Sequence, residues 1–331
     1  KSGTKFDIGF DGAFSAEGRV RLNAKRFELT EASVEIGGQT ITGELRIIDD
    51  ARHRAEITLE TARLSSSDLF PATISSLEAA VRGAVGLSQN EQLSNPAPEV
   101  SQSDATDGDK SETDITLRVL AGELKHGDAT FRDVDATLAM EAGEIRIPST
   151  KFTTSDGLKI SVEGRIQDSA SAPKGTLAFD VAGDTPQSSK DLVTLLNLHS
   201  LIAQERAEKF GLSKLAGLIE LGRRGPTTTD INLSGSIGAT NLDAMGEFDK
   251  GFANWRVAPV RLNVSLTGQD LQSVISMFGA ALPPGSESNT RPASIRLTTA
   301  GILESQSATL LEVKADGLTL AYDGSLSWPL T

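Results

Sequence analysis

The sequence predicts a mainly β protein with a few short helices, folded as an elongated antiparallel β-meander of repeated units that forms a curled sheet or groove. Three observations support this prediction. A glycine motif recurs four times, apolar and polar residues alternate with period two along most of the chain, and glycine-containing turns separate the alternating stretches.

The repeated motif places a glycine inside a short alternating stretch. Its four copies are ITGELRI at 41–47, SVEGRIQ at 161–167, AMGEFDK at 244–250 and YDGSLSW at 322–328. After each of the first three copies an Asp-Leu pair follows the glycine by 24 to 27 residues. A glycine within a strand marks a bulge or a strong bend. A repeated unit that cannot close its own core must bury its apolar face against neighbours, which favours an extended architecture.

The alternating stretches are predicted to be strands with one apolar and one polar face. Ile115, Leu117 and Val119, for example, alternate with Thr116 and Arg118. Glycine supplies the positive φ of tight hairpins, and the expected turns are Gly37-Gly38, Ala142-Gly143, Asp156-Gly157 and Asp316-Gly317. Short turns join antiparallel neighbours. The residues predicted to line the apolar face are Ile115, Leu117, Val119, Leu138, Met140, Ile145, Ile147, Leu158, Ile160, Val162, Leu177, Phe179, Val181, Val260, Leu262, Val264 and Leu266.

Three segments are predicted to be helical. The first, 65–81, follows a Ser/Asp cap, and the third covers 270–279. The second, 188–222, is expected to contain two helices broken near Gly211, and the apolar stripe of its second helix is Leu215, Leu218, Ile219 and Leu221. The recurrent Asp-Leu pairs at Asp68, Asp191 and Asp270 are each expected to start a helix, where the helix dipole favours a carboxylate.

A polar segment at 88–114 is rich in Ser, Asp and Pro and is predicted to be a flexible acidic insert, because it has too little apolar surface to order itself. The insert separates a first β repeat with its helix, at 1–87, from a second repeat with a helical segment, at 115–225. A third repeat with a short helix is expected at 226–285, and a partial fourth at 286–331.

Composition and motifs narrow the class of function. The formal charge is −13 and no Lys/Arg cluster is present, so nucleic acid is not expected as a partner, because phosphate binding needs a basic surface. The sequence contains no nucleophile elbow, phosphate-binding glycine loop or zinc-protease helix. None of the three His has a second His or a carboxylate pair at useful spacing. No enzymatic activity, catalytic residue, metal or cofactor is therefore expected.

The apolar face has two interpretations. It is either the closed core of a sandwich, which is the commoner arrangement, or the floor of an open groove that holds a hydrophobic ligand. Its side chains are mostly mid-sized aliphatic groups with few aromatic ones, and the repeats show no evident end, which favours the groove. Strands of about eight residues would give a width of about 27 Å, enough for an acyl chain that fills half of a ~30 Å hydrocarbon layer.

Two stretches, 27–70 and 115–166, resemble the AsmA family of bacterial envelope proteins. The residues that fit the family pattern of strand, turn and strand are Asp133-Val134, Leu138, Gly143, Ile145, Ile147, Gly157 and Gly164. The resemblance extends over nearly the whole chain. It implies a periplasmic protein tethered to the inner membrane of a Gram-negative bacterium, with a β-groove that carries lipid during outer-membrane biogenesis.

The resemblance makes a non-enzymatic module that binds or conducts phospholipid or another lipid the leading hypothesis. The alternative is an envelope scaffold or assembly factor for outer-membrane proteins, with envelope proteins as partners and the apolar face only as a core. No run of ~18 apolar residues is present. The chain starts at Lys1 and stops at Thr331, soon after the fourth motif, so both ends are expected to be cuts in a longer polypeptide that carries the inner-membrane anchor.

Overall fold

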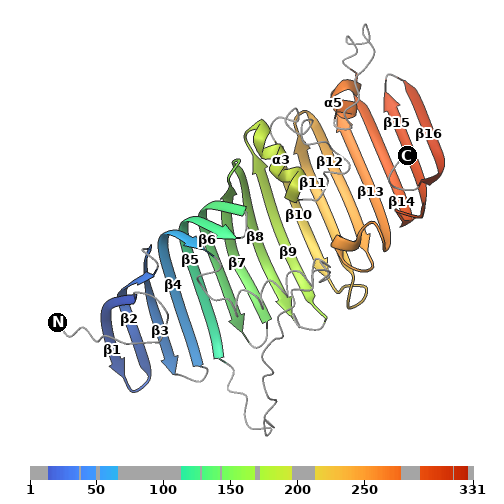
Figure 1. The fold of residues 1–331 in the computed structure, drawn as a ribbon. Helices are drawn as coiled ribbons and strands as arrows, with labels where there is room; N and C mark the ends of the chain where they lie inside the picture. The colour runs from blue at the N-terminus through green and yellow to red at the C-terminus, as the bar shows by residue number, and fades with distance from the viewer. Residues whose placement is uncertain are drawn as a thin grey trace.

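A computed structural model describes residues 14–36, 39–49, 53–65, 113–126, 129–141, 144–167, 172–195, 213–276, 291–315 and 317–326. These residues form one sheet of sixteen strands, which lie side by side in chain order (Figure 1). All fifteen neighbouring pairs are antiparallel except β4 with β5.

The first half of the sheet contains β1 (Phe14–Asn23), β2 (Arg26–Ile36), β3 (Gln39–Asp49), β4 (His53–Ser65), β5 (Thr113–His126), β6 (Ala129–Glu141), β7 (Glu144–Thr154) and β8 (Leu158–Gln167). The second half contains β9 (Lys174–Gly183), β10 (Ser213–Leu221), β11 (Thr229–Ile237), β12 (Thr240–Phe248), β13 (Pro259–Gly268), β14 (Ala293–Ile302), β15 (Gln306–Ala315) and β16 (Leu318–Leu326). The described helices are α3 (Pro186–Leu195), α5 (Leu271–Ser276) and the 3-10 helix η1 (Phe252–Asn254).

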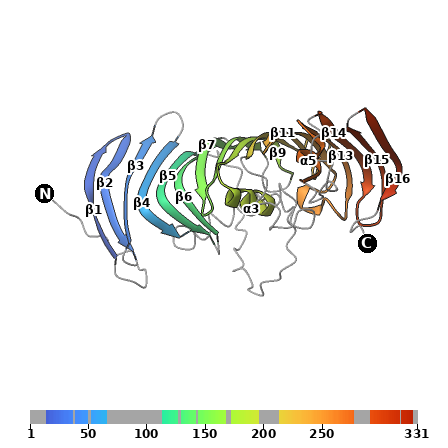
Figure 2. The same ribbon diagram turned by 90° about the horizontal axis from the view of Figure 1, so that it is seen from above.

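The predicted fold class is confirmed, because the protein is mainly β with a few short helices and its strands form an elongated meander. Sixteen strands about 4.8 Å apart make a sheet about 70 Å long. The finer description changes: the sheet is a single twisted layer that does not close and does not curl into a groove. Its edge strands, β1 and β16, lie at opposite ends of that layer (Figures 1 and 2).

Strands β4 and β5 form the one parallel pair in the described sheet, and here the prediction of an antiparallel neighbour is wrong. Ile57 still lies opposite Leu117, so the apolar residues of the two strands share a face. A parallel pair requires a crossover of a dozen or more residues. The chain between the two strands, 66–112, has that length. This segment lies outside the described residues, as do almost all of the predicted helix 65–81 and the acidic insert 88–114.

The helix predicted at 270–279 is confirmed as far as Ser276 by α5. The helical prediction for 188–222 is only partly right, because α3 ends the described helix at Leu195 and residues 213–221 form strand β10. Leu215, Ile219 and Leu221 face one side of the sheet opposite β9, and Leu218 faces the other. An apolar run this short fits the period of a helix as well as that of a strand. In this protein the segment 213–221 is a strand. Residues 196–212, with the predicted break near Gly211, lie outside the described residues.

The four repeated glycines lie in β3, β8, β12 and β16. At Gly164 φ is 153°, and a Cβ would lie 2.1 Å from the carbonyl oxygen of Thr176. A bulge lies next to Gly164, but it is in the neighbouring strand β7, between Ile147 and Thr150, and the glycine's own strand β8 pairs with β9 in a continuous register. At Gly246 the register is continuous, and the missing side chain instead makes room for the ring of Phe248.

The predicted turn at Asp156-Gly157 is confirmed between β7 and β8. Gly157 has a φ of 91°, and its N–H donates to the carbonyl of Thr154 at 3.1 Å. At the turn between β15 and β16, Gly317 also has positive φ, 75°. The other predicted turn residues, Gly37-Gly38, Ala142-Gly143 and Asp316, lie outside the described residues.

Candidate functional site

One face of the sheet is apolar along its whole length, and we call it the apolar face. Residues directly opposite each other on neighbouring strands point to the same face, so the register identifies its members. Ile160 lies opposite Val181, and Val181 opposite Leu215. Further along the sheet, Leu242 lies opposite Leu266. Each strand therefore continues the apolar surface of the strand before it.

All seventeen residues predicted to line the apolar face lie on this one side. Ile115 lies opposite Met140, and Met140 lies opposite Ile145. The same face then continues from β7 into β8 and β9. It connects β9 to β13 through β10, β11 and β12. The alternation of apolar and polar residues was therefore sufficient to assign the face, even though the bulge in β7 shifts the register by one residue.

The seventeen residues differ in how much water they contact. Ile145, Leu158, Ile160, Val181, Val260 and Leu266 are buried, Met140 is 42% exposed, and the other ten are half-buried. For all of the buried residues except Ile145, this division follows the three elements that pack on the apolar face. Leu192 of α3 packs with Leu158, Ile160, Val181 and Leu215; Val274 of α5 packs with Leu266, Ala293 and Ile295; Trp255, next to η1, packs with Phe248 and Val260.

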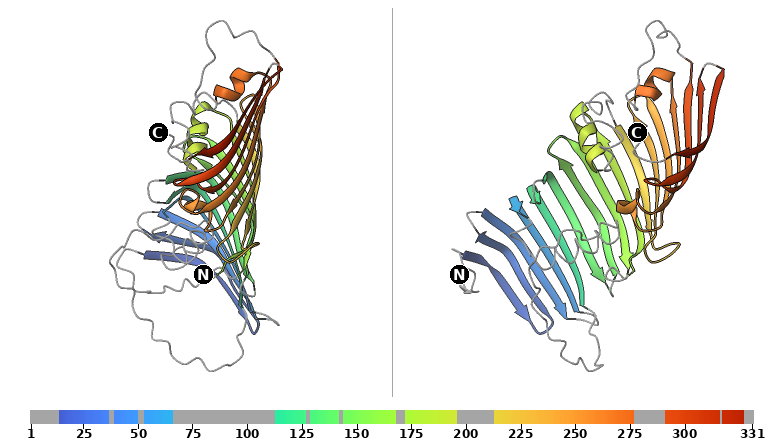
Figure 3. Two further views of the ribbon diagram at one scale, coloured as in Figure 1. Left: turned by 90° about the vertical axis from the view of Figure 1, so that its right-hand side faces the viewer. Right: turned by 45° about the vertical axis from the view of Figure 1, so that its right-hand side comes forward.

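Helices α3 and α5 lie on the same side of the sheet (Figures 2 and 3). They cover one end of the strands, and Trp255 covers the other end of β12 and β13. Between the covered ends, one row of half-buried apolar side chains crosses the sheet from β8 to β15, and we call it the central strip. Its larger members are Val162, Phe179, Leu233, Val264, Leu297 and Leu311.

Sequence reasoning missed part of this surface. Leu233, Leu297 and Leu311 of the central strip were not among the predicted residues, although Ile231, Leu233 and Gly235 alternate with polar residues in the stretch 229–237. Counting period-two alternation through every predicted strand would have found them. Leu215 was missed because its segment was interpreted as a helix.

Helix α3 has polar contacts at its N-terminus, which cap it, and in its interior, which connect it to the sheet. Thr185 and Ser188 form a reciprocal cap, in which the Ser188 N–H donates to Thr185 Oγ1 at 3.1 Å and the Thr185 N–H donates to Ser188 Oγ at 3.3 Å. Asp191 therefore does not start the helix, which corrects the prediction. It lies in the interior of α3, where its carboxylate accepts a hydrogen bond from the Thr154 hydroxyl of β7.

Burial raises the pKa of Asp191 above its ordinary value, and the nearby carboxylate of Asp156 raises the pKa further, while the Thr154 hydrogen bond opposes the shift. The folded state thus favours the protonated carboxyl. As the pH rises through the ordinary pKa of an unfolded Asp and then through the raised folded pKa, ionisation costs stability. Asp191 therefore contributes most in acid and least at neutral pH.

We expect Asp191→Asn to be as stable as the parent, or more stable, at pH 7, and to lose this advantage in acid. The variant Asp135→Asn is a control in which the pH dependence of stability has the opposite sign, because the hydrogen bond from Arg118 lowers the pKa of Asp135. That variant should be less stable at pH 7, and the difference should shrink as the pH falls. Urea unfolding at several pH values would measure both differences. A constant difference for Asp191→Asn across the range would contradict the prediction.

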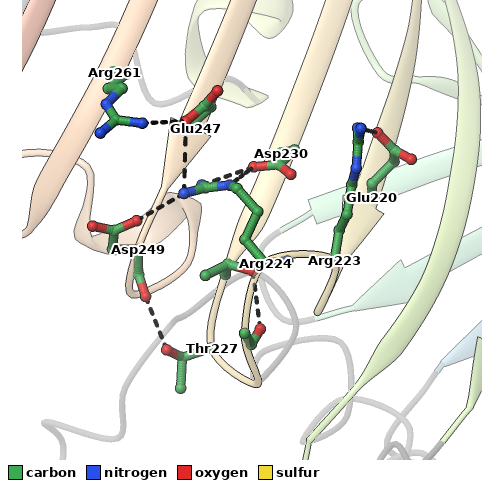
Figure 4. Close-up of polar contacts among 10 residues, drawn as sticks. Glu220, Arg223, Arg224, Thr227, Asp230, Glu247, Asp249 and Arg261 are labelled. Carbon is green, nitrogen blue, oxygen red and sulfur yellow. Dashed lines mark hydrogen bonds and ion pairs between the residues drawn. The ribbon is translucent and has the colours of Figure 1, made fainter.

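The opposite face of the sheet is polar, and one charged cluster of its described residues surrounds Arg224 at the turn between β10 and β11 (Figure 4). Arg224 contacts Asp230 of β11 at 2.8 Å, Asp249 at 3.1 Å and Glu247 of β12 at 3.6 Å. The hydrogen bond to Asp230 is the main reason that the pKa of Arg224 is raised. Glu247 also pairs with Arg261 of β13 at 3.3 Å. This cluster ties three neighbouring strands together, and a structural role accounts for it.

The described residues contain no group of three or more His, Cys, Asp or Glu side chains arranged to hold a metal ion. None of the helices in the described ranges is long and apolar enough to cross a membrane. No protein-family model, no curated protein and no solved structure matches the chain.

Proposed function

We propose that the apolar face binds the acyl chains of phospholipid or another lipid, and that the protein holds or conducts lipid without catalysing a reaction. The central strip is the observation that supports this proposal. It is a continuous row of half-buried apolar side chains on a layer that no second sheet covers within the described residues. A contiguous apolar surface of this kind is uncommon on soluble proteins and marks a binding site.

The dimensions of the central strip suit an acyl chain. Eight strands, β8 to β15, with about 4.8 Å between neighbours give a strip about 34 Å long. An acyl chain fills half of a ~30 Å hydrocarbon layer, about 15 Å, so the strip is longer than one chain. Each methylene that leaves water on binding contributes about 0.8 kcal/mol. Binding along the strip would therefore be favourable without any polar contact.

The resemblance to the AsmA family supplies the cellular context of the proposal. We place the protein in the periplasm, tethered to the inner membrane of a Gram-negative bacterium, with a role in outer-membrane biogenesis and phospholipid transport between membranes. Envelope proteins are candidate partners that would deliver or receive the lipid. Lipid binding by the protein and its location in the cell are independent properties, and each needs its own test.

The alternative function, an envelope scaffold or assembly factor for outer-membrane proteins, is favoured by the two covered ends of the strands. Leu158 and Val274 are fully buried beneath or within α3 and α5, as core residues are. If the segments outside the described residues cover the central strip in the same way, the whole apolar face is a core. A scaffold would then present its polar face and its sheet edges to protein partners.

Photo-crosslinking in cells separates the two functions. A photoreactive amino acid at Leu233, in the central strip, should capture lipid that mass spectrometry can identify. Met245 provides the matched control, because its side chain is apolar and 55% exposed but lies on the polar face, opposite Asn232 and Asn263. Lipid adducts at Leu233 and not at Met245 would support the proposal. Equal capture at the two positions, or none at Leu233, would refute it.

A further inference from the structure

Helix α3 covers one end of the apolar face, and its connection to the sheet is short. Strand β9 ends at Gly183 and α3 begins at Pro186, so two residues join them (Figure 1). Leu192 of α3 packs on four apolar strand residues, none of them more than 6% exposed. These four residues are Leu158, Ile160, Val181 and Leu215. Without α3 they would continue the central strip toward the ends of β8, β9 and β10.

Polar contacts attach α3 to the turn between β7 and β8. The hydroxyl of Thr154 accepts a hydrogen bond from the Leu158 N–H at 3.0 Å and donates to the carboxylate of Asp191. The hydroxyl of Thr185, directly before α3, donates to the carbonyl of Asp156 at 3.3 Å. The helix is thus attached to one turn through Thr185 at its N-terminus and through Asp191 in its interior.

This attachment brings together two carboxyl groups, Asp191 of α3 and Asp156 of the turn. Burial is the largest cause of the raised pKa of Asp191, the hydrogen bond from Thr154 opposes it, and the Asp156 carboxylate raises the pKa further. Two carboxylates that share a site do not both ionise without cost, whereas one proton between them gives a hydrogen bond in place of repulsion. A protonated Asp191 therefore favours the docked helix, and an ionised one disfavours it.

The strand residues beneath α3 bring no charge to this carboxyl pair. Those of β8 and β9 are Leu158, Ile160, Val181 and Gly183. Lys159 of β8 lies on the polar face, where it pairs with Asp184 at 2.7 Å. On α3 itself Lys190 precedes Asp191, and adjacent residues of a helix do not face each other. The protonation of the two carboxyl groups therefore sets the charge at this contact.

We propose that α3 is a proton-controlled cover, which stays on the apolar face while Asp191 and Asp156 share a proton and moves off the sheet when both are ionised. Its release exposes the four apolar residues beneath it, so the pH regulates how far the lipid-binding surface extends. This consequence for lipid rests on the proposed function. The movement of α3 does not.

The pH dependence of the cover has a defined sign. Because the pKa of Asp191 is raised while α3 is docked, docking is most favourable below the ordinary pKa of an Asp and weakens as the pH rises through the raised pKa. If the docked helix holds the proton ten times more tightly than the released helix, docking becomes about ten times weaker between acid and neutral pH. Helix α5, with the sequence LQSVIS, has no titratable side chain and provides an internal control.

Thiol accessibility measures the release of α3, since the chain has no native cysteine. Val181→Cys places a thiol beneath α3 and Ala293→Cys places one beneath α5, at positions that are 3% and 2% exposed. Each variant is treated with a pyridyl disulfide reagent over a series of pH values. The ratio of the two reaction rates cancels the intrinsic pH dependence of the reaction. We expect this ratio to rise several-fold from acid to neutral pH.

Two further substitutions test which carboxylate is responsible. Asp191→Asn keeps the size of the side chain and removes its titration, so the ratio should no longer change with pH in this background. Asp184→Asn is the matched control, because it removes a carboxylate next to α3 that pairs with Lys159 on the polar face. It should leave the change with pH as large as in the parent. Far-UV circular dichroism should show every variant folded at each pH.

Phenylnaphthylamine, an uncharged dye that fluoresces in apolar surroundings, tests the consequence for binding. The parent should bind more of it at neutral pH than in acid, and Asp191→Asn should bind equal amounts at both.

A thiol ratio that is constant with pH, or that rises equally in Asp191→Asn, would overturn the proposal. So would a rising ratio with equal dye binding at both pH values in the parent. A rising ratio without dye binding at any pH would instead refute the apolar binding site and leave the movement of α3 supported, so the two failures are distinguishable.

Discussion

Ile160→Lys is expected to unfold the part of the sheet beneath α3, whereas Leu138→Lys is expected to leave the fold intact. Ile160 is 6% exposed and packs in the cluster that contains Leu192 of α3. A lysine there would bury an unpaired charge, at a cost of several kcal/mol. Leu138 lies on the same apolar face, opposite Leu117, but is half-buried. A lysine at that position can extend its ammonium group to water, so the loss should be about 1 kcal/mol.

Urea unfolding of the two variants beside the parent protein measures this difference directly. Both variants replace an aliphatic side chain of the apolar face with lysine. A difference in their stability therefore reports whether the position is covered or uncovered. If Leu138→Lys lost as much stability as Ile160→Lys, residues near Leu138 would be a closed core, and the lipid-binding proposal would lose its support there.

The face of the sheet on which each side chain lies could be predicted from the sequence, because it depends on a local rule. Period-two alternation assigns each side chain to a face without knowledge of any partner strand. The seventeen predicted residues therefore fell on one side of the sheet, including those next to the β7 bulge. The fold class followed from the same rule, since regularly spaced strands with short turns make a meander.

What the sequence did not reveal depends on contacts between distant segments. The parallel pairing of β4 with β5 joins two strands that are separated in the sequence by residues 66–112, a stretch without a strand pattern of its own. In the segment 213–221, Leu215, Ile219 and Leu221 fit the period of a strand, and together with Leu218 they also fit the stripe of a helix. Only the pairing of this segment with β9 and β11 makes it a strand. Asp191 looked like a helix cap because its own neighbours are helical, but the cap formed six residues earlier at Thr185.

The division of the apolar face into buried and half-buried residues could not be predicted for the same reason. Ile160 and Val162 are two residues apart, have similar side chains and lie on one strand face. Ile160 is buried because α3 passes over it, and Val162 is half-buried in the central strip. Nothing in the alternating pattern distinguishes them, so the extent of the candidate site needed the structure.

Gly164→Val is expected to destabilise the protein by about 3 kcal/mol or more, although valine is the better strand former. The Cβ would lie 2.1 Å from the Thr176 carbonyl oxygen and 2.9 Å from the Leu177 Cα, both backbone atoms of β9 that cannot move without breaking the pairing of β8 with β9. The φ of 153° adds strain for a β-branched residue.

Gly225→Ala provides the control for Gly164→Val, because Gly225 lies in the turn between β10 and β11 and the nearest atom to its Cβ would be 3.6 Å away, on Thr228. Its effect on the free energy of unfolding, measured with urea, should be within about 0.5 kcal/mol. A Gly164→Val protein as stable as this control would mean that the two strands can separate to admit a side chain. A large loss at Gly164 alone would mean that close backbone approach between β8 and β9, rather than local strand preference, requires the glycine of the second repeat.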